Sequence, residues 1–329
     1  MRRLLLTAAT TTAAALTLAA CGTTEPAADS SKKTSESIRL TDSTGAKVEL
    51  DGPAKKVVAT EWNEVESLIT LGVDPVGVAD VKGYKTWDTA VPLKNEPKDI
   101  GTRGEPSMDT IASLSPDLIV ASSDLPDAAV KQMRKIAPVL EIKSADASDQ
   151  IGQMFTNLDL IAKATGTTDN AKTARTDFEA KVAEGKKALT DAKLDGTDIA
   201  FADGYVTSNQ VSLRPYTSGS LIGSVNERLG LKNAWKVKGD PAYGLGTTDV
   251  EGLTGLPKDV RFAYIGNDKD ETSTPFTGAL EKNAVWTSLP FVKADKVHRL
   301  PDGIWMFGGP QSMEAYIDAL VDALTKQKR

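Results

Sequence analysis

The sequence contains almost no cysteine or histidine: Cys21 and His298 are the only residues of these two types among 329. A disulfide needs two cysteines, and protein zinc sites are built mainly from cysteine and histidine. One residue of each type therefore excludes a disulfide framework and argues against a Cys- or His-rich metal site. We interpret His298 as structural, and we expect no cofactor and no metal bound directly by the protein.

Motifs of common enzymes are missing as well. The sequence has no G-x-S-x-G, H-E-x-x-H or G-x-x-x-x-G-K-[ST] segment, and one histidine cannot serve most catalytic triads. The overall charge is acidic, since 45 aspartates and glutamates outnumber 39 lysines and arginines and give a net charge of −6. This balance argues against nucleic-acid binding, which needs a basic surface.

The N-terminus has the features of an export signal. Two arginines precede an uncharged run of leucine, alanine and threonine at Leu4–Ala20, which ends in small residues. A membrane-spanning helix needs about 20 consistently apolar residues, and this run is shorter and diluted by threonine. We therefore predict a signal peptide at residues 1–20, followed by a flexible linker at residues 21–37, which are rich in Ser, Thr, Ala and Lys.

The segment Leu18–Cys21 (LAAC) resembles the lipobox of bacterial lipoproteins. The resemblance implies that signal peptidase cuts before Cys21 and that the thiol carries a diacylglyceryl group. Two acyl chains anchor a protein stably where one binds only marginally, at about 0.8 kcal/mol per buried methylene. We therefore expect a lipid-anchored protein on the extracytoplasmic side of the cell membrane.

Short apolar segments alternate with helical patterns along the rest of the chain. Buried strands are predicted before residue 150 at KKVVATE, PVGVAD, LIVASS and VLEIK, and again after residue 195 at DIAFADG, NQVSLRP, RFAYIGN and KVHRL. Strands that alternate with helices typically form mostly parallel sheets. The sequence thus predicts an α/β fold with two similar lobes.

No strand pattern occurs between Ile151 and Leu189, where the sequence predicts amphipathic helices. About 300 residues remain after the signal peptide, a length that suggests two domains. We therefore predict an N-terminal α/β lobe at residues 38–165, an inter-lobe helix at 166–194 and a C-terminal α/β lobe at 195–329.

Aromatic residues make up only 5% of the chain, yet many lie in loops beside glycine and proline. Loops at the carboxyl ends of parallel strands are where open α/β sheets bind ligands, and the planar arginine side chain suits paired oxygen acceptors. Local packing is the alternative for each aromatic residue, and a surface ion pair for each arginine. The predicted ligand-binding residues are Arg103, Arg214, Trp62, Tyr84, Trp87, Tyr205, Tyr216, Trp235, Tyr243, Trp305 and Phe307.

Two segments resemble one protein family. GTRGEPSMDTIASLSPDLIVASSD is similar to the N-lobe signature of ferric-siderophore substrate-binding proteins of ABC importers. ADGYVTSNQVSLRPYTSGSLIGSVNERLGLKNAW is similar to the C-lobe opening of the hydroxamate and citrate branch. The resemblance implies two lobes joined by a rigid helix, an iron chelate in the cleft between them, and hydrogen bonds from Arg103 to the chelate. Ser107–Asp109 departs from the family's usual Asn-Leu-Glu.

The charge of the predicted site favours one class of chelate. A tris-catecholate iron complex is roughly trianionic and calls for several cations, whereas the sequence offers two arginines, with Lys82 and Lys85 as rim charges. Ferrioxamine-type tris-hydroxamates are near neutral or cationic, and their methylene linkers suit aromatic walls. We expect a ferric hydroxamate, with ferric citrate second and cobalamin or haem lower. A lipoprotein hydrolase is the alternative from another class.

The resemblance also implies an ABC transporter permease as partner, bound through one acidic residue on each lobe. The candidates are Asp124 and Asp127 in the N-lobe, and Asp270 and Glu271 in the C-lobe. Of these, Asp127 and Glu271 are preferred. An acidic side chain at a helix start also suits the helix dipole, which is the alternative role for the first pair. We expect a monomer.

Overall fold

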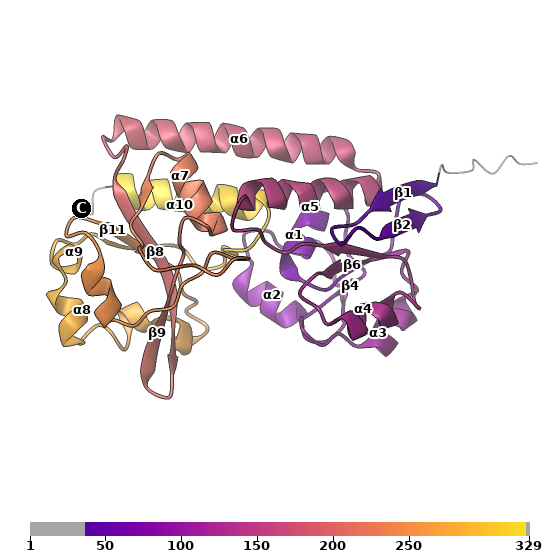
Figure 1. Cartoon of the computed structure of the whole chain (residues 1–329), viewed down its shortest axis with the longest axis horizontal. Coiled ribbons are helices and arrows are strands. Elements are labelled where there is room, and N and C mark those ends of the chain that lie inside the picture. Colours follow the sequence, from indigo (N-terminus) through magenta and orange to yellow (C-terminus); the bar gives the residue numbers. More distant parts are fainter. Residues whose placement is uncertain (1–36, 327–329) are drawn as a thin grey trace, which may run out of the picture. The chain divides into compact units, whose positions relative to one another are not determined.

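The computed structural model of the chain describes residues 37–326 (Figure 1). The predicted signal peptide, Cys21 and nearly all of the predicted linker lie outside the described residues. Residues 37–326 belong to one compact unit. Within the part of the chain that the structure describes, no helix is both long enough and apolar enough to cross a membrane.

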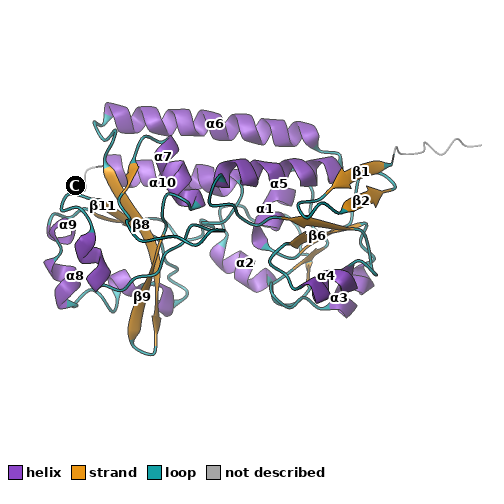
Figure 2. Ribbon diagram, in the orientation of Figure 1, coloured by secondary structure: helices purple, strands orange, loops and turns teal. Residues whose placement is uncertain are grey.

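The first half of the described chain forms a parallel five-stranded sheet, in the order β5-β4-β3-β6-β7. Figure 2 shows β6 of this sheet among the helices of the same half. Every residue of β3 and β6 is buried, as expected for parallel strands covered on both faces. A small antiparallel sheet of β1 and β2 precedes it. The strands are β1 (Ile38–Thr41), β2 (Lys47–Leu50), β3 (Val57–Ala59), β4 (Gly77–Val78), β5 (Lys98–Asp99), β6 (Leu118–Ser122) and β7 (Val139–Ile142). The helices between these strands are α1 (Trp62–Thr70), α2 (Val81–Trp87), α3 (Met108–Leu114) and α4 (Asp127–Met133).

The second half contains another five-stranded sheet, in which β10, β8, β11 and β12 are parallel and β9 pairs with β8 antiparallel. The predicted fold class, α/β with mostly parallel sheets, is confirmed. The antiparallel strand arises because only Ser208 and Asn209 separate β8 from β9, and their φ angles of 51° and 62° form a tight hairpin turn. The strands are β8 (Asp198–Thr207), β9 (Gln210–Pro215), β10 (Lys232–Asn233), β11 (Arg261–Tyr264) and β12 (Val297–Arg299). The helices are α7 (Leu221–Arg228), η1 (Glu251–Gly255), η2 (Glu271–Ser273), η3 (Pro275–Thr277), α8 (Ala284–Ser288), α9 (Pro290–Lys293) and α10 (Pro310–Thr325).

Two long helices lie between the sheets in sequence. α5 (Gln150–Thr165) ends at Gly166, whose φ of 73° closes the helix, and α6 (Thr168–Asp191) follows at once. α6 packs along both α10 and α5 (Figure 1). Gly185 allows this close approach, because a Cβ atom there would lie only 2.7 Å from Cγ2 of Ile317 on α10.

The largest apolar cluster runs through both halves of the chain. It contains Val57 and Leu68 from the first half, Phe178 from α6, and Phe201 and Tyr316 from the second half. One continuous core thus supports the loops at the carboxyl ends of both sheets. The division into lobes at residues 165 and 194 stays a prediction.

Candidate ligand-binding cleft

An open cleft with a volume of about 360 Å³ collects side chains from both halves of the chain. Glu61 and Arg103 follow strands β3 and β5, while Tyr205 and Arg214 belong to the β8–β9 hairpin. The cleft is lined by Glu61, Asn63, Arg103, Tyr205, Arg214, Tyr243, Leu245, Trp305 and Phe307. Six of these nine residues belong to the set predicted from the sequence. Both predicted arginines therefore face the same space.

Arg103 rests on aromatic rings and pairs with one carboxylate. Its Nη1 atom donates to Oε1 of Glu61 at 2.9 Å. Its guanidinium carbon lies 4.1 Å from the ring centre of Trp62 and 5.5 Å from that of Trp305, distances typical of cation–π contacts. The side chain is 35% exposed. Arg103 is thus oriented by its neighbours and still open to a ligand.

Glu61 is held in place because it is the N-cap of α1. Its side chain accepts a hydrogen bond from the backbone N–H of Trp62 at 2.7 Å, and Oε2 of Glu64 accepts one from the backbone N–H of Glu61 at 2.9 Å. This reciprocal arrangement is a capping box. Burial, followed by the charge of Glu61, raises the pKa of Glu64 well above its ordinary value. The carboxylate of Glu61 is therefore fixed at the cleft wall by the helix that it begins.

Arg214 has a much more enclosed partner. Its Nε atom donates to Oδ1 of Asp203 at 2.9 Å, and its Nη2 atom bonds Oδ2 of the same side chain. Tyr216 donates its hydroxyl to Oδ2 of Asp203 at 3.1 Å. Asp203 is only 3% exposed and lies directly opposite Arg214 in the hairpin register. Strand pairing thus places a buried carboxylate behind the second arginine.

Aromatic rings form a continuous wall along the cleft. The ring centres of Trp305 and Phe307 lie 5.2 Å apart, and that of Tyr243 lies 5.6 Å from Phe307. Trp62 continues the wall beneath Arg103, with its ring centre 4.7 Å from Trp305. The hydroxyl of Tyr243 donates to Oδ2 of Asp124 at 2.5 Å and so links the two halves. Such a wall suits the apolar linkers of a ligand with polar groups elsewhere.

Trp305 and Phe307 belong to a loop, residues 303–309, which we call the aromatic loop. The carbonyl of Gly303 accepts hydrogen bonds from the backbone N–H groups of Thr89 and Ala90, both at 2.9 Å. At the other end, Oε2 of Glu66 on α1 accepts from the backbone N–H of Gly309 at 2.7 Å. The aromatic loop is therefore bonded at both ends to the first half of the chain.

Two buried carboxyl groups lie at the end of this loop. Oε1 of Glu66 also accepts from the hydroxyl of Ser312 at 2.8 Å, and both Glu66 and Asp88 are buried. Burial, followed by the charge of Glu66, raises the pKa of Asp88 to about 11, and burial also raises the pKa of Glu66. Two adjacent buried carboxylates cannot both ionise cheaply. The pair therefore retains at least one proton at neutral pH.

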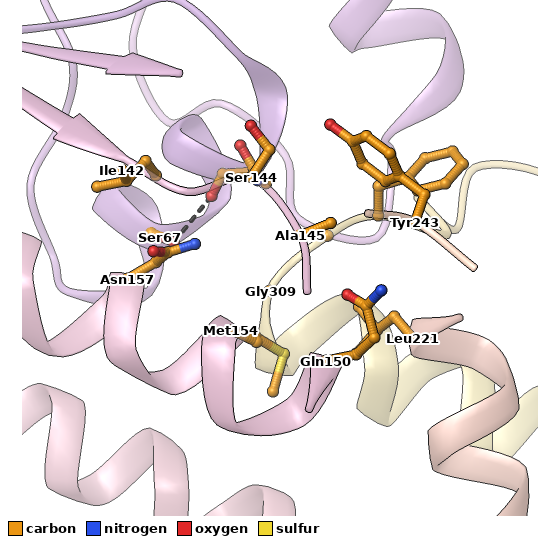
Figure 3. A pocket seen from close by; sticks show the side chains of 13 residues that line it. Ser67, Ile142, Ser144, Ala145, Gln150, Met154, Asn157, Leu221, Tyr243 and Gly309 are labelled. Carbon is orange, nitrogen blue, oxygen red and sulfur yellow. Dashed lines mark hydrogen bonds between the residues drawn. The ribbon is translucent and has the colours of Figure 1, made fainter. Parts of the chain in front are cut away.

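A second, smaller cavity lies next to the cleft (Figure 3). Its volume of about 30 Å³ holds no more than a water molecule, and Asn63, Tyr243 and Phe307 line both spaces. Gln150 crosses between the halves here, with its Nε2 atom donating to the carbonyls of Gly219 at 2.9 Å and Ala242 at 2.7 Å. This cavity is too small for an iron chelate, so the open cleft is the candidate ligand site.

Five of the predicted residues do not line the cleft. Trp62 and Tyr216 are buried directly behind it, under Arg103 and Arg214. Tyr84 is fully buried and donates its hydroxyl to the carbonyl of Val91 at 2.5 Å. Trp235 is buried in the second half, with its Nε1 atom donating to the carbonyl of Phe201 at 2.8 Å, and Trp87 packs against the main core. The last three serve packing, so we leave them out of the proposed site.

Sequence reasoning missed the acidic partners of both arginines. Glu61 and Glu64 are spaced as in a capping box after a strand, a signal that marks the start of a helix rather than a binding residue. Asp203 and Arg214 are matched only once β8 and β9 pair. Lys85, expected as a rim charge, pairs with Glu96 at 2.6 Å, and neither Lys85 nor Lys82 lines the cleft.

The acidic candidates for permease docking lie in different settings. Asp127 is exposed at the start of α4, and Glu271 is exposed in η2. Asp270 caps η2 by accepting from the N–H of Thr272 at 3.0 Å. Asp124 accepts the hydroxyl of Tyr243, so it borders the cleft rather than an outer surface. Asp127 and Glu271 therefore remain candidates for contact with a permease.

Direct metal coordination finds no support in the described residues. Between residues 37 and 326, no group of three or more His, Cys, Asp or Glu side chains could hold a metal ion. The cleft instead offers guanidinium, carboxylate, hydroxyl and aromatic groups. Such groups recognise the outer atoms of a ligand.

Comparison with known proteins places these features in a family. The model of the periplasmic binding protein family matches residues 57–303. The Fe(3+)-citrate-binding protein YfmC of Bacillus subtilis is 30% identical over 90% of this chain and 89% of its own. The probable siderophore-binding lipoprotein YfiY of the same organism is 25% identical over 88% of each chain. The crystal structure of siderophore-binding protein FhuD from Vibrio cholerae, with bound Fe3+–Desferal, is similar in fold with a TM-score of 0.72. It is 24% identical and covers 82% of this chain and 98% of its own.

Proposed function

We propose, from the premise that this chain belongs to the periplasmic binding protein family, that it captures a ferric hydroxamate siderophore and delivers it to the permease of an ABC importer. The family consists of substrate-binding proteins, so the chain is not an enzyme. Relatives that match over nearly their whole length are named for ferric citrate and siderophore binding. This supports an iron(III) chelate as the ligand class.

The observation that carries the hydroxamate assignment is the composition of the cleft. Four aromatic side chains line it, and the only cationic groups among its described lining residues are Arg103 and Arg214, each already paired with a carboxylate. A polyanionic chelate would leave uncompensated charge in this space, which costs several kcal/mol when buried. A near-neutral chelate with methylene linkers fits the aromatic wall without that cost. The guanidinium of Arg103 then donates hydrogen bonds to its oxygens.

Ferric citrate is the second candidate. The relative YfmC, which shares 30% identity, is named for this ligand. Citrate would recruit Arg103 and Arg214 through its carboxylates.

Tryptophan fluorescence separates these candidates. Trp305 lines the cleft and Trp62 lies behind Arg103, so an iron chelate bound there should quench their emission. Titration with Fe3+–Desferal should give saturable quenching at lower concentrations than titration with ferric citrate. Saturable quenching by ferric citrate alone would contradict the hydroxamate assignment. Absence of quenching by every iron chelate tested would contradict the proposed function.

We further propose that the mature protein is anchored through Cys21 by lipid. The relative YfiY is named as a lipoprotein, and the lipobox resemblance provides the residue. Cys21→Ser should yield unprocessed or released protein when cell fractions are compared by immunoblotting. A processed variant that stays in the membrane fraction like the parent would overturn this assignment.

Asp127 and Glu271 are proposed as the charges that meet the permease, because both are exposed at helix starts on opposite halves. Exposed charge pairs set encounter rate and register more than ligand affinity. Asp127→Lys combined with Glu271→Lys should leave chelate binding intact while cellular iron uptake falls. Uptake at the parental rate would discard these two positions.

A further inference from the structure

We propose that Glu61 determines the charge preference of the cleft, by favouring neutral and cationic iron chelates over anionic ones. This inference rests on the proposed function, since it concerns which chelates the cleft accepts. Three charged side chains line the cleft: Glu61, Arg103 and Arg214. Asp203, directly behind Arg214, is the fourth charge of the site. These two positive and two negative groups cancel, so together they carry no formal net charge that would attract an anion.

The two carboxylates differ in what a ligand can reach. Asp203 is 3% exposed and is enclosed by Arg214 and Tyr216. The side chain of Glu61 is 24% exposed and lines the cleft itself. Of these two carboxylates, Glu61 is therefore the one that can act directly on the charge of a bound chelate.

Glu61 cannot turn away when a ligand arrives. Its side chain caps α1 through the N–H of Trp62, and its own backbone N–H is bonded to the buried Glu64. A ligand that draws the guanidinium of Arg103 toward itself leaves this carboxylate in place, without its ion pair. An anionic ligand then meets a fixed negative charge, whereas a pendant ammonium gains a partner.

A second acidic group reinforces this polarity. Asp124 accepts the hydroxyl of Tyr243, another residue of the cleft lining, at 2.5 Å. Its carboxylate is exposed at the edge of the same space. Among the residues that the structure describes, no lysine lines the cleft to offset these two groups. The reachable carboxylates thus lie on the first-half side of the site, where Arg103 is the one cation among the lining residues.

Three probes of graded charge test the inference. Fe3+–Desferal carries one free ammonium group, its N-acetylated form is neutral with the same iron centre, and ferric citrate is anionic. Dissociation constants for all three are measured on the purified protein by fluorescence quenching and calorimetry. The key variant is Glu61→Gln, because the amide oxygen still accepts from the N–H of Trp62 and preserves the cap. Asp109→Asn removes the same charge from an exposed position on α3 and serves as the matched control.

Glu61→Gln should weaken binding of Fe3+–Desferal relative to its acetylated form by about threefold to tenfold, the effect of one charge at short range in a partly solvated site. Binding of ferric citrate should tighten by a similar factor, and Asp109→Asn should change neither ratio. If Glu61→Gln folds poorly in a circular dichroism melt, Glu61→Asn supplies the same neutralisation with a preferred N-cap residue.

The outcomes separate the two claims. Suppose that the wild-type protein binds the hydroxamate chelates and that the Glu61 variants show the same charge preferences as Asp109→Asn. This result would overturn the role of Glu61 and leave the proposed function standing. Failure of the wild-type protein to bind either hydroxamate chelate overturns the proposed function, and this inference with it. Loss of affinity for all three probes alike would show that Glu61 acts on cleft structure and would also overturn the charge role.

Discussion

Arg103 and Arg214 face the same cleft from opposite halves of the chain, yet they are held in different ways. Arg103 makes one hydrogen bond to the partly exposed Glu61 and lies on Trp62. Arg214 makes two bonds to the buried Asp203, which also accepts from Tyr216. Side-chain exposure is nearly equal, 35% for Arg103 and 33% for Arg214. The exposure of the two arginines therefore does not distinguish them. The burial of their carboxylate partners does.

The difference separates a binding role from a structural one. A ligand can replace Glu61, the partly exposed partner of Arg103, at little cost, because ion pairs in contact with solvent contribute only about 0–1 kcal/mol. Removing Arg214 from Asp203 would leave a buried carboxylate unpaired, at a cost of about 3–5 kcal/mol. We therefore expect Arg103 to move between partners and Arg214 to stay where it is.

The largest effect is expected when the buried carboxylate is neutralised. Asp203→Asn should lower the free energy of unfolding by about 3 kcal/mol, near the lower end for a broken buried pair because Arg214 keeps some contact with water. Glu61→Gln, the same change in the other pair, should cost less than about 1 kcal/mol. Urea unfolding followed by circular dichroism measures both. Equal losses in the two variants would abolish the distinction between the pairs.

The next effect concerns chelate affinity. Arg103→Ala should weaken binding by about 1.5–3 kcal/mol, the range for a hydrogen bond to a charged group, with little change in unfolding free energy. Arg214→Ala should instead act mainly by lowering the unfolding free energy, because the buried Asp203 loses its partner. Fluorescence titration and urea unfolding of both variants test this. An Arg103→Ala protein that binds every ferric hydroxamate and citrate with parental affinity would remove Arg103 from the site.

A separate effect is a pH dependence of stability that comes from buried carboxyl groups behind the cleft. The pKa of Asp88 is raised to about 11, so the folded protein keeps a proton that the unfolded chain releases above about pH 4. The unfolded state thus binds fewer protons, so the unfolding free energy should fall as pH rises above about 5 toward that folded-state pKa.

Asp88→Asn tests the origin of this slope, since an amide cannot titrate. The variant should show a shallower decline in unfolding free energy between pH 5.5 and 8.5, with residual slope from Glu64 and Glu66, whose pKa values are also raised. Asp109→Asn, at an exposed site, should retain the parental slope. A slope in Asp88→Asn identical to that of the parent would assign the pH dependence to other groups.

The fold was largely predictable because its signals are local. Buried segments such as LIVASS appear as β6, and the strand-free stretch between the two sheets appears as α5 and α6. The hairpin was less visible, since NQVSLRP has an ordinary strand composition and only its two-residue connection forces antiparallel pairing.

The site was predictable only in part. Residue type and loop position identify Arg103, Arg214, Trp305 and Phe307, which line the cleft. They do not separate Tyr243, which lines it, from Tyr84, which is fully buried under Trp62, because both follow glycine-rich or charged loop segments. Depth of burial depends on packing between distant segments, and so do the partners Glu61 and Asp203.

The hydrogen bonds between the aromatic loop, α1 and the segment after α2 also make the two halves of the chain depend on each other for ligand recognition. Trp305 and Phe307 are encoded near the end of the chain, but Glu66, Thr89 and Ala90 hold their loop. The rings of Trp305 and Phe307, which lie beside the first half in the cleft, therefore come from the last tenth of the polypeptide. A fragment cut at the predicted boundary near residue 195 would retain Glu61, Trp62 and Arg103 and would lose Trp305 and Phe307. Recombination between relatives should thus preserve recognition only when residues 303–309 are exchanged together with the first half.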